Sequence, residues 1–271
     1  MDVWEQIIWK NILQIRNTSP LVHNITNYVV MNNTANAVLA VGASPVMAHA
    51  HPEIDDMVQI CQSVVINIGT LDEYWVASMI RAAERASQLQ KPWILDPVGA
   101  GATPYRNSVL EQLLAFKPTV IRGNASEILA LAKHNLTTTK GVDSTAQSNE
   151  AVSAAQCLNR EFGSIVCVSG ETDIIVTGWQ IYYVRNGSTM MTRVTGLGCS
   201  ATAVIGAFIA GIENKAEAVL AATALFGISG EIAARQAAGT GSLQVLLLDK
   251  LYNITLEEIK QLIRVEAVNA A

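Results

Sequence analysis

Charged side chains are scarce in this sequence of 271 residues, at 15% of the total, against about 25% in ordinary soluble domains. Eighteen Lys and Arg stand against 23 Asp and Glu, and the absence of a basic block argues against nucleic acid or an anionic membrane as the main partner. Half of the residues are hydrophobic, and the mean hydropathy is +0.28. This composition does not suit a disordered chain and favours a heavily buried α/β protein or an oligomer.

Cysteine is also sparse, and its spacing does not match a zinc site or a disulfide framework. The four cysteines lie far apart, with no CxxC motif and no Cys/His pair; they are Cys61, Cys157, Cys167 and Cys199. This pattern is typical of a reduced chain with mostly buried thiols. We therefore expect a cytoplasmic protein.

No segment has the pattern of a signal peptide or of a membrane span. Asp2 and Glu5 lie among apolar residues near the N-terminus, whose spacing predicts an amphipathic helix. Residues 194–212 carry no charge, but the segment opens with a glycine-containing loop and the rest is too short to cross a bilayer. We expect a buried, alanine-rich helix there and no contact with a membrane.

Short runs rich in Val and Ile alternate with longer stretches of helical period over the first 170 residues. The expected strands are 21–27, 44–48, 64–70, 93–96, 119–123 and 165–169, and the expected helices are 28–40, 71–88, 107–116, 126–133 and 147–162. Alternation of this kind predicts an α/β fold, in which a mostly parallel central sheet carries helical crossovers on both faces.

The pattern changes after Gly170. Two short β-rich runs, 174–177 and 180–184, predict a hairpin, and a further strand is expected at 190–194. From Cys199 onward the sequence is helical in character, with helices expected at 199–212, 215–236, 243–252 and 255–264. We find no linker, low-complexity tract or internal repeat, so residues 1–271 are expected to form one domain.

A glycine-containing loop, 195–199, precedes the expected helix at 199–212. Gly196 and Gly198 let the backbone approach a ligand closely, and the first amides of a helix are unpaired donors that favour an anion such as phosphate. A plain connecting turn is the alternative. Gly196, Gly198 and Ala201 also match a G-x-G-x-x-A dinucleotide fingerprint, but that motif needs a strand after the helix, and another helix follows here.

Cys199 stands where that helix begins, a position that lowers the pKa of a thiol. It could act as a covalent nucleophile, as a general base or simply as a small residue that fits. No His neighbours it in the sequence, which weakens the nucleophile role. Beside phosphate donors, a base that deprotonates an attacking hydroxyl is the better chemical hypothesis.

Polar residues follow several expected strands, and ligands bind beyond the carboxyl ends of strands in open parallel sheets. Asp96 and Glu127 could hold Mg²⁺ through oxygen ligands or water, and Arg122 could pair with phosphate oxygens. Asn124 and Glu127 alone could be a helix cap and its first-turn acid. Ser169 could add a nucleotide contact. Asn27 and Met47 could line a pocket for a small uncharged substrate.

Taken together, these segments resemble the hydroxyethylthiazole kinases, a branch of the ribokinase-like superfamily. The resemblance runs over nearly the whole chain and rests on residues 19–27 (SPLVHNITN), 42–47 (GASPVM), 67–70 (NIGT), 95–102 (LDPVGAGA), 121–127 (IRGNASE) and 195–199 (TGLGC). It implies a ribokinase-like fold and ATP-dependent phosphorylation of the hydroxyl of 4-methyl-5-(2-hydroxyethyl)thiazole, a step of thiamine salvage. It also implies Mg²⁺ and a homotrimer whose substrate site lies near a subunit interface.

The resemblance also implies roles for individual positions. Arg122 and Ser169 contact ATP, with Asn124 beside them, and Met47 and Gly196 contact the thiazole, with Asn27 beside them. Asp96 and Glu127 serve Mg²⁺ and the phosphates. Gly198 belongs to the catalytic loop, and Cys199 takes the place of the catalytic base. Most relatives across the superfamily have Asp at that last position. Leu197 and residues 239–243 (GTGSL) depart from the family pattern in smaller ways.

Two other functions stay open from the sequence. A related vitamin kinase, acting on a hydroxymethylpyrimidine or a pyridoxal-like alcohol, would share the glycine loop. A ligand-binding regulatory protein could keep the fold and lose the chemistry, although it would have no need of Mg²⁺ carboxylates.

Overall fold

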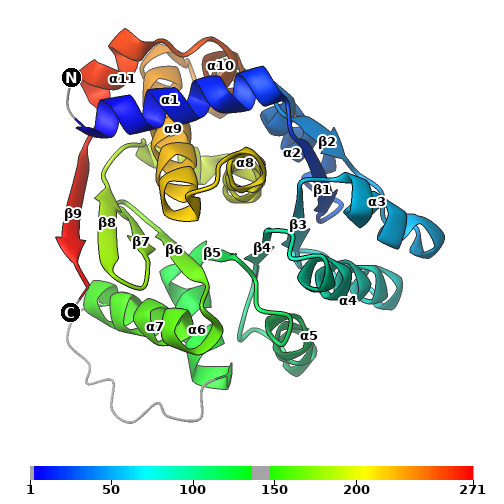
Figure 1. The fold of residues 1–271 in the computed structure, drawn as a ribbon. Coiled ribbons are helices and arrows are strands. Elements are labelled where there is room, and N and C mark those ends of the chain that lie inside the picture. The colour runs from blue at the N-terminus through cyan, green and yellow to red at the C-terminus, as the bar shows by residue number, and fades with distance from the viewer. Residues whose placement is uncertain (1–2, 136–146, 271) are drawn as a thin grey trace.

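A nine-stranded sheet lies at the centre of the computed structural model, which describes residues 3–135 and 147–270 (Figure 1). Its strands are β1 (Leu21–Ile25), β2 (Ser44–Val46), β3 (Ser63–Asn67), β4 (Trp93–Asp96), β5 (Val120–Asn124), β6 (Ile165–Ser169), β7 (Asp173–Val176), β8 (Gln180–Val184) and β9 (Val265–Asn269). Their order is β2–β1–β3–β4–β5–β6–β7–β8–β9. The pairs from β2 to β6 are parallel and the pairs from β6 to β9 are antiparallel, which confirms the mostly parallel sheet.

Helices cover both faces of this sheet, as the alternating pattern predicts (Figure 1). One face carries α1 (Val3–Thr18), α2 (Met31–Ala40), α8 (Leu197–Gly211), α9 (Lys215–Gln236), α10 (Thr240–Asn253) and α11 (Leu256–Leu262). The other carries α3 (Ile54–Ile60), α4 (Glu73–Gln88), α5 (Pro104–Leu114), α6 (Ala125–Asn135) and α7 (Gln147–Phe162). Two 3-10 turns, η1 (His51–Glu53) and η2 (Thr189–Arg193), join elements at the strand ends.

The sheet separates two hydrophobic cores, and alternate residues of one strand enter different cores. In β3, Val64 and Ile66 pack under α3–α7, whereas Val65 between them packs under α8. This is the two-residue period of a strand buried on both faces. It explains why the central strands read as unbroken apolar runs.

Helix α8 lies unusually close to the sheet. A Cβ atom at Gly206 would lie 2.3 Å from Cγ2 of Val65, and the Ser63 hydroxyl donates a hydrogen bond of 2.7 Å to the Gly206 carbonyl. Glycine is therefore required in the middle of α8. The contact fixes the height of the helix over the strand ends.

Helix α9 is long and apolar enough to cross a membrane by composition, but 89% of its most apolar stretch is buried inside the protein. Seventeen of its residues are buried, on all sides of the helix. A helix that is apolar all round and enclosed by protein is a core helix.

Two expectations for the C-terminal half are wrong. Residues 190–194 do not form a strand: η2 occupies Thr189–Arg193, and its first turn is capped by the Ser188 side chain, which accepts a bond from the Met190 amide. The two sides of β8 are already paired with β7 and β9, so the apolar run has no free edge there to extend. The expected helix 255–264 ends at Leu262, and β9 follows it, a strand that the sequence analysis missed.

Candidate active site

Polar side chains converge beyond the carboxyl ends of the parallel strands. Asn27 lies two residues after β1, and Asn67 and Asp96 are the last residues of β3 and β4. The chain runs from β1 outward to β2 and then back across to β3, so the strand order reverses between β1 and β3. Such a reversal opens a crevice where ligands bind in α/β sheets. The convergence of these strand ends is as predicted.

A hydrogen-bonded chain of side chains links these strand ends. The Asn27 amide Nδ2 donates to Asn67 Oδ1 at 2.8 Å, and Asn67 Nδ2 donates to Asp96 Oδ2 at 2.7 Å. Asn27 Nδ2 also lies 3.6 Å from Cys199 Sγ. Asn27, Asn67 and Asp96 are exposed by 4%, 1% and 4%. Because both polar atoms of the Asn27 and Asn67 side chains are paired, the orientation of both amides is fixed. Asn67 is a residue of the candidate site that the sequence analysis did not single out.

The glycine loop is the N-terminus of α8, which begins two residues earlier than predicted and follows η2 rather than a strand. The first bond of the helix runs from the Ser200 amide to the Gly196 carbonyl at 2.9 Å, so the amides of residues 197–199 precede it. Gly196 has a φ of +80°, and a Cβ there would lie 2.4 Å from Val30 Cγ1. The fold therefore requires a glycine at position 196.

Gly198 differs from Gly196 because the protein leaves room beside it. A Cβ there would meet Arg122 Nη1 at 3.7 Å, an ordinary contact. Packing within the chain therefore does not explain this glycine. Space at a helix N-terminus, next to a guanidinium group, suits an anionic ligand.

Arg122 ties the start of α8 to the strand ends. Its Nη1 donates to the Gly198 carbonyl at 3.0 Å and to Thr202 Oγ1 at 3.4 Å, and that hydroxyl donates to Asp96 Oδ2 at 2.8 Å. Thr202 was missed by the sequence analysis. Its signal was the spacing of four from Gly198, which places both residues on one side of the helix.

The prediction that the pKa of the Cys199 thiol is lowered is wrong. Burial, and next the nearby Asp96 carboxylate, raise the pKa of Cys199 to about 11, and the amides of Asn67 and Asn27 only partly offset this. Burial likewise raises the pKa of Asp96 to about 6, against the lowering effect of Arg122. The helix N-terminus therefore does not yield a thiolate at neutral pH in this setting.

Glu127 connects two loops of the site. Its Oε1 accepts a bond of 3.0 Å from the Gly99 amide, after β4, and its Oε2 accepts one of 2.8 Å from the Asn124 amide, at the end of β5. Asn124 Oδ1 in turn accepts from the Glu127 amide, so these two residues form the helix cap that the sequence analysis weighed as an alternative. In the described parts of the chain, no group of three or more His, Cys, Asp or Glu side chains forms a cluster that could hold a metal ion.

A cavity of about 650 Å³ opens beside these residues, on the β5–β8 side. Three residues expected to contact ATP line it, together with the glycine expected to belong to the catalytic loop: Arg122, Asn124, Ser169 and Gly198. The residues expected to contact the other substrate, Asn27, Met47 and Gly196, do not line it, and neither does Cys199. Met47 directly follows β2, the edge strand next to β1, and is half-buried. The structure thus separates the predicted site into two halves on either side of the α8 N-terminus.

Comparison with known proteins gives one consistent result. Residues 12–257 match the model of the hydroxyethylthiazole kinase family. A hydroxyethylthiazole kinase of Syntrophus aciditrophicus is 52% identical over 268 residues, covering 98% of this chain and 99% of that protein. One of Photobacterium profundum is 50% identical over 266 residues, covering 98% and 96%.

Solved structures agree with the sequence matches. A hydroxyethylthiazole kinase structure from Pyrococcus horikoshii superposes with a TM-score of 0.90 at 42% identity, covering 97% of this chain and 99% of that one. A Staphylococcus aureus pyridoxal kinase in complex with AMP-PCP and pyridoxal has a TM-score of 0.64 at 14% identity, covering 93% and 99%, and shares the fold.

Proposed function

The chain belongs to the hydroxyethylthiazole kinase family, and from that premise we propose that its active site is the α8 N-terminus with the strand ends on either side of it. The protein is a kinase that phosphorylates the hydroxyl of 4-methyl-5-(2-hydroxyethyl)thiazole with ATP, the thiamine salvage step of this family. The observation that carries the site is the unit of Arg122, Thr202 and Asp96, which ties the first turn of α8, through the Gly198 carbonyl and the Thr202 hydroxyl, to the strand ends.

ATP occupies the cavity on the β5–β8 side. Arg122, Asn124 and Ser169 line it, and Gly198 at its edge leaves room for a phosphate group. The helix amides would stabilise the negative charge that develops on the transferred group. Phosphoryl transfer is mostly a matter of positioning and electrostatics, so this arrangement suits it.

The thiazole alcohol occupies the opposite side, near Asn27, Met47 and Gly196. Its hydroxyl oxygen attacks the γ-phosphorus in line, the bond to the bridging oxygen breaks, and ADP leaves. The hydroxyl proton passes to an oxygen of the transferred phosphoryl group and from there to solvent. With its pKa at about 11, Cys199 is a neutral thiol at pH 7, and its Sγ orients the hydroxyl rather than carrying a full charge. A reaction of this kind does not require a strong base at the hydroxyl, because the transition state is loose.

Asp96 and Glu127 are the residues that would hold Mg²⁺. Both offer carboxylate oxygens, the hard ligands that this ion prefers. Burial, and to a smaller extent the charge of Glu127, raise the pKa of Asp96, and Arg122, Thr202 and Asn67 offset only part of this, so a cation beside the two carboxylates would stabilise the ionised form. Both Glu127 oxygens already accept backbone amide bonds, which favours contact through water for that residue. Bound there, Mg²⁺ would neutralise charge on the β- and γ-phosphates.

We further propose a cytoplasmic homotrimer of single kinase domains, in which a second copy covers the alcohol half. Tyr28 and Val29, directly after Asn27, are exposed by 56% and 62%. Apolar side chains next to a buried polar site are typical of a surface that a partner covers. The continuous sheet from β2 to β9 supports one domain.

An ADP-release assay with three alcohols tests the function. We expect turnover with the hydroxyethylthiazole at least tenfold above that with a hydroxymethylpyrimidine or with pyridoxal. Preference for either of the latter would assign the chain to a related vitamin kinase activity. ATP-independent binding of the thiazole with no ADP release would instead indicate a regulatory protein.

A further inference from the structure

Residues 185–191 form one wall of the cavity proposed for ATP. Arg185, Asn186, Gly187, Ser188, Thr189 and Met191 all line it. The segment connects β8 to η2, so its first residues lie outside the sheet. Its position must therefore come from contacts behind it, on the side away from the cavity.

Two glycines of α9 let this segment lie directly against the helix. A Cβ at Gly227 would lie 2.7 Å from the Asn186 carbonyl oxygen, and one at Gly230 would lie 2.3 Å from Met191 Sδ. A side chain at Gly227 would push the backbone of the segment away from α9, whereas one at Gly230 would displace the Met191 side chain. The helix surface thus sets how far back the wall can lie.

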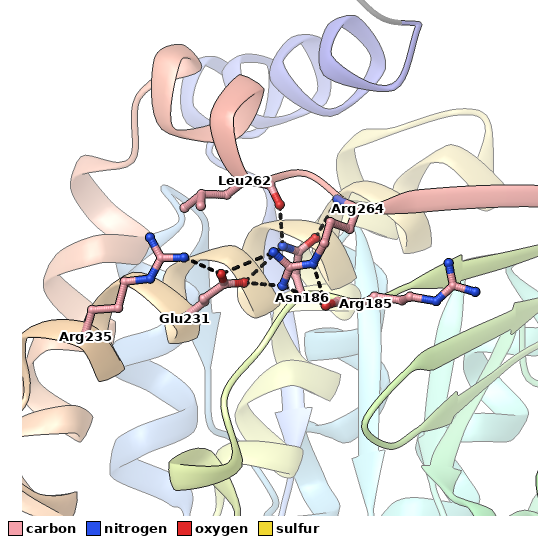
Figure 2. Close-up of polar contacts among 6 residues, drawn as sticks. All are labelled: Arg185, Asn186, Glu231, Arg235, Leu262 and Arg264. Atoms are coloured by element: carbon pink, nitrogen blue, oxygen red, sulfur yellow. Dashed lines mark hydrogen bonds and ion pairs between the residues drawn. The ribbon is translucent and has the colours of Figure 1, made fainter.

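Glu231 follows these glycines and bonds to the same segment. The residue is 8% exposed, and its Oε2 accepts bonds from Asn186 Nδ2 at 3.2 Å and from Arg264 Nη2 at 2.6 Å (Figure 2). Its Oε1 accepts from Arg235 at 2.6 Å. Burial raises the pKa of Glu231, but the bonds from Arg264 and Asn186 outweigh it, so the pKa lies below its usual value.

Arg264, just before β9, completes the attachment. Its Nε and Nη2 donate to the Arg185 carbonyl at 3.1 and 2.8 Å, and its own amide donates to Asn186 Oδ1 at 3.0 Å. Asn186 Nδ2 also donates to the Leu262 carbonyl at 2.7 Å (Figure 2). The Asn186 side chain is therefore fully used in holding the segment.

We propose that Glu231 and Arg264 are positioning residues for the nucleotide: they hold residues 185–187 as a fixed wall of the ATP cavity. Neither residue lines the cavity itself, so both act through Asn186 and its neighbours. The inference rests on the proposed function, since it takes the cavity to be the ATP site. It adds that the affinity for ATP depends on the C-terminal part of the chain, whereas the affinity for the thiazole does not.

Glu231→Gln tests this proposal, because it keeps the shape of the side chain and removes its charge. Hydrogen bonds to charged groups are the strong ones, so we expect the Kd of a non-hydrolysable ATP analogue, measured by calorimetry, to rise roughly tenfold. The KM for ATP should rise in parallel. The kcat and the KM for the thiazole should stay within about twofold, which a general loss of structure would not produce.

Glu258→Gln is the matched control. Glu258 is also a partly buried glutamate in an ion pair, with Lys250 at 2.7 Å, and it accepts bonds from Thr255. None of these three residues lines the cavity. The control variant should lose thermal stability but keep the wild-type Kd for the ATP analogue.

Arg264→Lys provides a second variant on a half-exposed side chain, in case Glu231→Gln does not fold. Lysine keeps the charge but cannot reach Glu231 and the Arg185 carbonyl together, so an intermediate rise in Kd, about threefold, is expected. A wild-type Kd in both variants, or equal losses for ATP and thiazole, would overturn the proposal. A wild-type chain that binds the analogue but phosphorylates none of the alcohols would instead overturn the proposed function, leaving the calorimetric comparison valid.

Discussion

The two halves of the candidate site differ in how completely one chain builds them. The nucleotide half is a cavity of about 650 Å³, with walls from β5, β6, the segment after β8, α8 and α9. The alcohol half has a polar floor of the buried Asn27 and Asn67 and the half-buried Cys199, but Tyr28 and Val29 beside it are largely exposed. In the proposed arrangement, ATP recognition is local to one chain, whereas the alcohol half would gain an enclosing surface from a second copy.

Gly198, between the two halves, gives the largest expected effect. Gly198→Asp places a carboxylate where a phosphate should lie and opposes the helix amides, so kcat/KM for ATP should fall by roughly 10³. Gly198→Ala is the control, since its methyl group meets Arg122 at ordinary contact distance and should not disturb the fold. ATP binding that survives in the Asp variant would place the phosphates elsewhere.

A substitution at Asp96 is expected to change activity and stability in opposite directions. Asp96→Asn keeps an oxygen that can accept the bonds from Asn67 and Thr202 but removes the charge, so we expect kcat to fall roughly 100-fold. Because the folded chain holds the Asp96 proton more tightly than an unfolded one, stability decreases as the pH rises through about 6. The variant should therefore have a higher Tm than wild type, more so at pH 7.5 than at pH 5.

The Tm is measured by thermal unfolding in buffer without divalent cations, and kcat is measured by ADP release with Mg²⁺. Asp249→Asn, an exposed position on α10, is the control for a general charge effect. A lower Tm at pH 7.5 in Asp96→Asn would show that the ionised carboxylate stabilises the fold after all.

Val29 tests the incomplete half directly. Val29→Glu would bury a charge in the proposed contact between copies, so the trimer should dissociate in light-scattering measurements and thiazole turnover should fall roughly 30-fold. The Kd for the ATP analogue should not change. Val245→Glu, at an equally exposed valine on α10, is the control and should keep the assembly intact. An equal loss of ATP binding in Val29→Glu would remove the contrast between the halves.

Cys199 gives the smallest expected effect. Cys199→Ala should lower kcat about tenfold and leave measurable turnover, since the thiol orients the hydroxyl and is largely neutral. The ratio of wild-type to variant kcat should stay constant from pH 7 to 8.5. With a pKa raised to about 11, a thiolate base would instead make that ratio grow tenfold per pH unit.

The position of the candidate site beyond the strand ends could be predicted from the sequence, because strand ends carry local signals. Asp96, Asn124 and Ser169 each end a run rich in Val and Ile, and parallel strands bring such ends together. Thr202 and Asn67 were harder to find, because a Thr in an apolar helix and an Asn within a strand have ordinary local explanations. Their contacts with Asp96 join residues 106 and 29 positions apart, which no short pattern encodes.

The errors have a common physical cause, namely competition from the rest of the fold. The helix N-terminus favours a thiolate at Cys199, but burial and Asp96 outweigh it. The apolar run at 190–194 could pair as a strand, but β9 already occupies that side of β8, and Met191 packs against Gly230 instead. The local sequence favours a thiolate at Cys199 and a strand at 190–194, but the packing of the folded chain determines the protonation state and the structure that form.

The close contact between Gly206 and Val65 limits which substitutions the active site can tolerate as the sequence diverges. A single added methyl group, two turns from Gly198, would lift α8 off the sheet and tilt its N-terminus away from Arg122 and Asp96. A substitution at Gly206, which is not among the residues proposed to contact a substrate, would therefore abolish activity although every reacting group is unchanged.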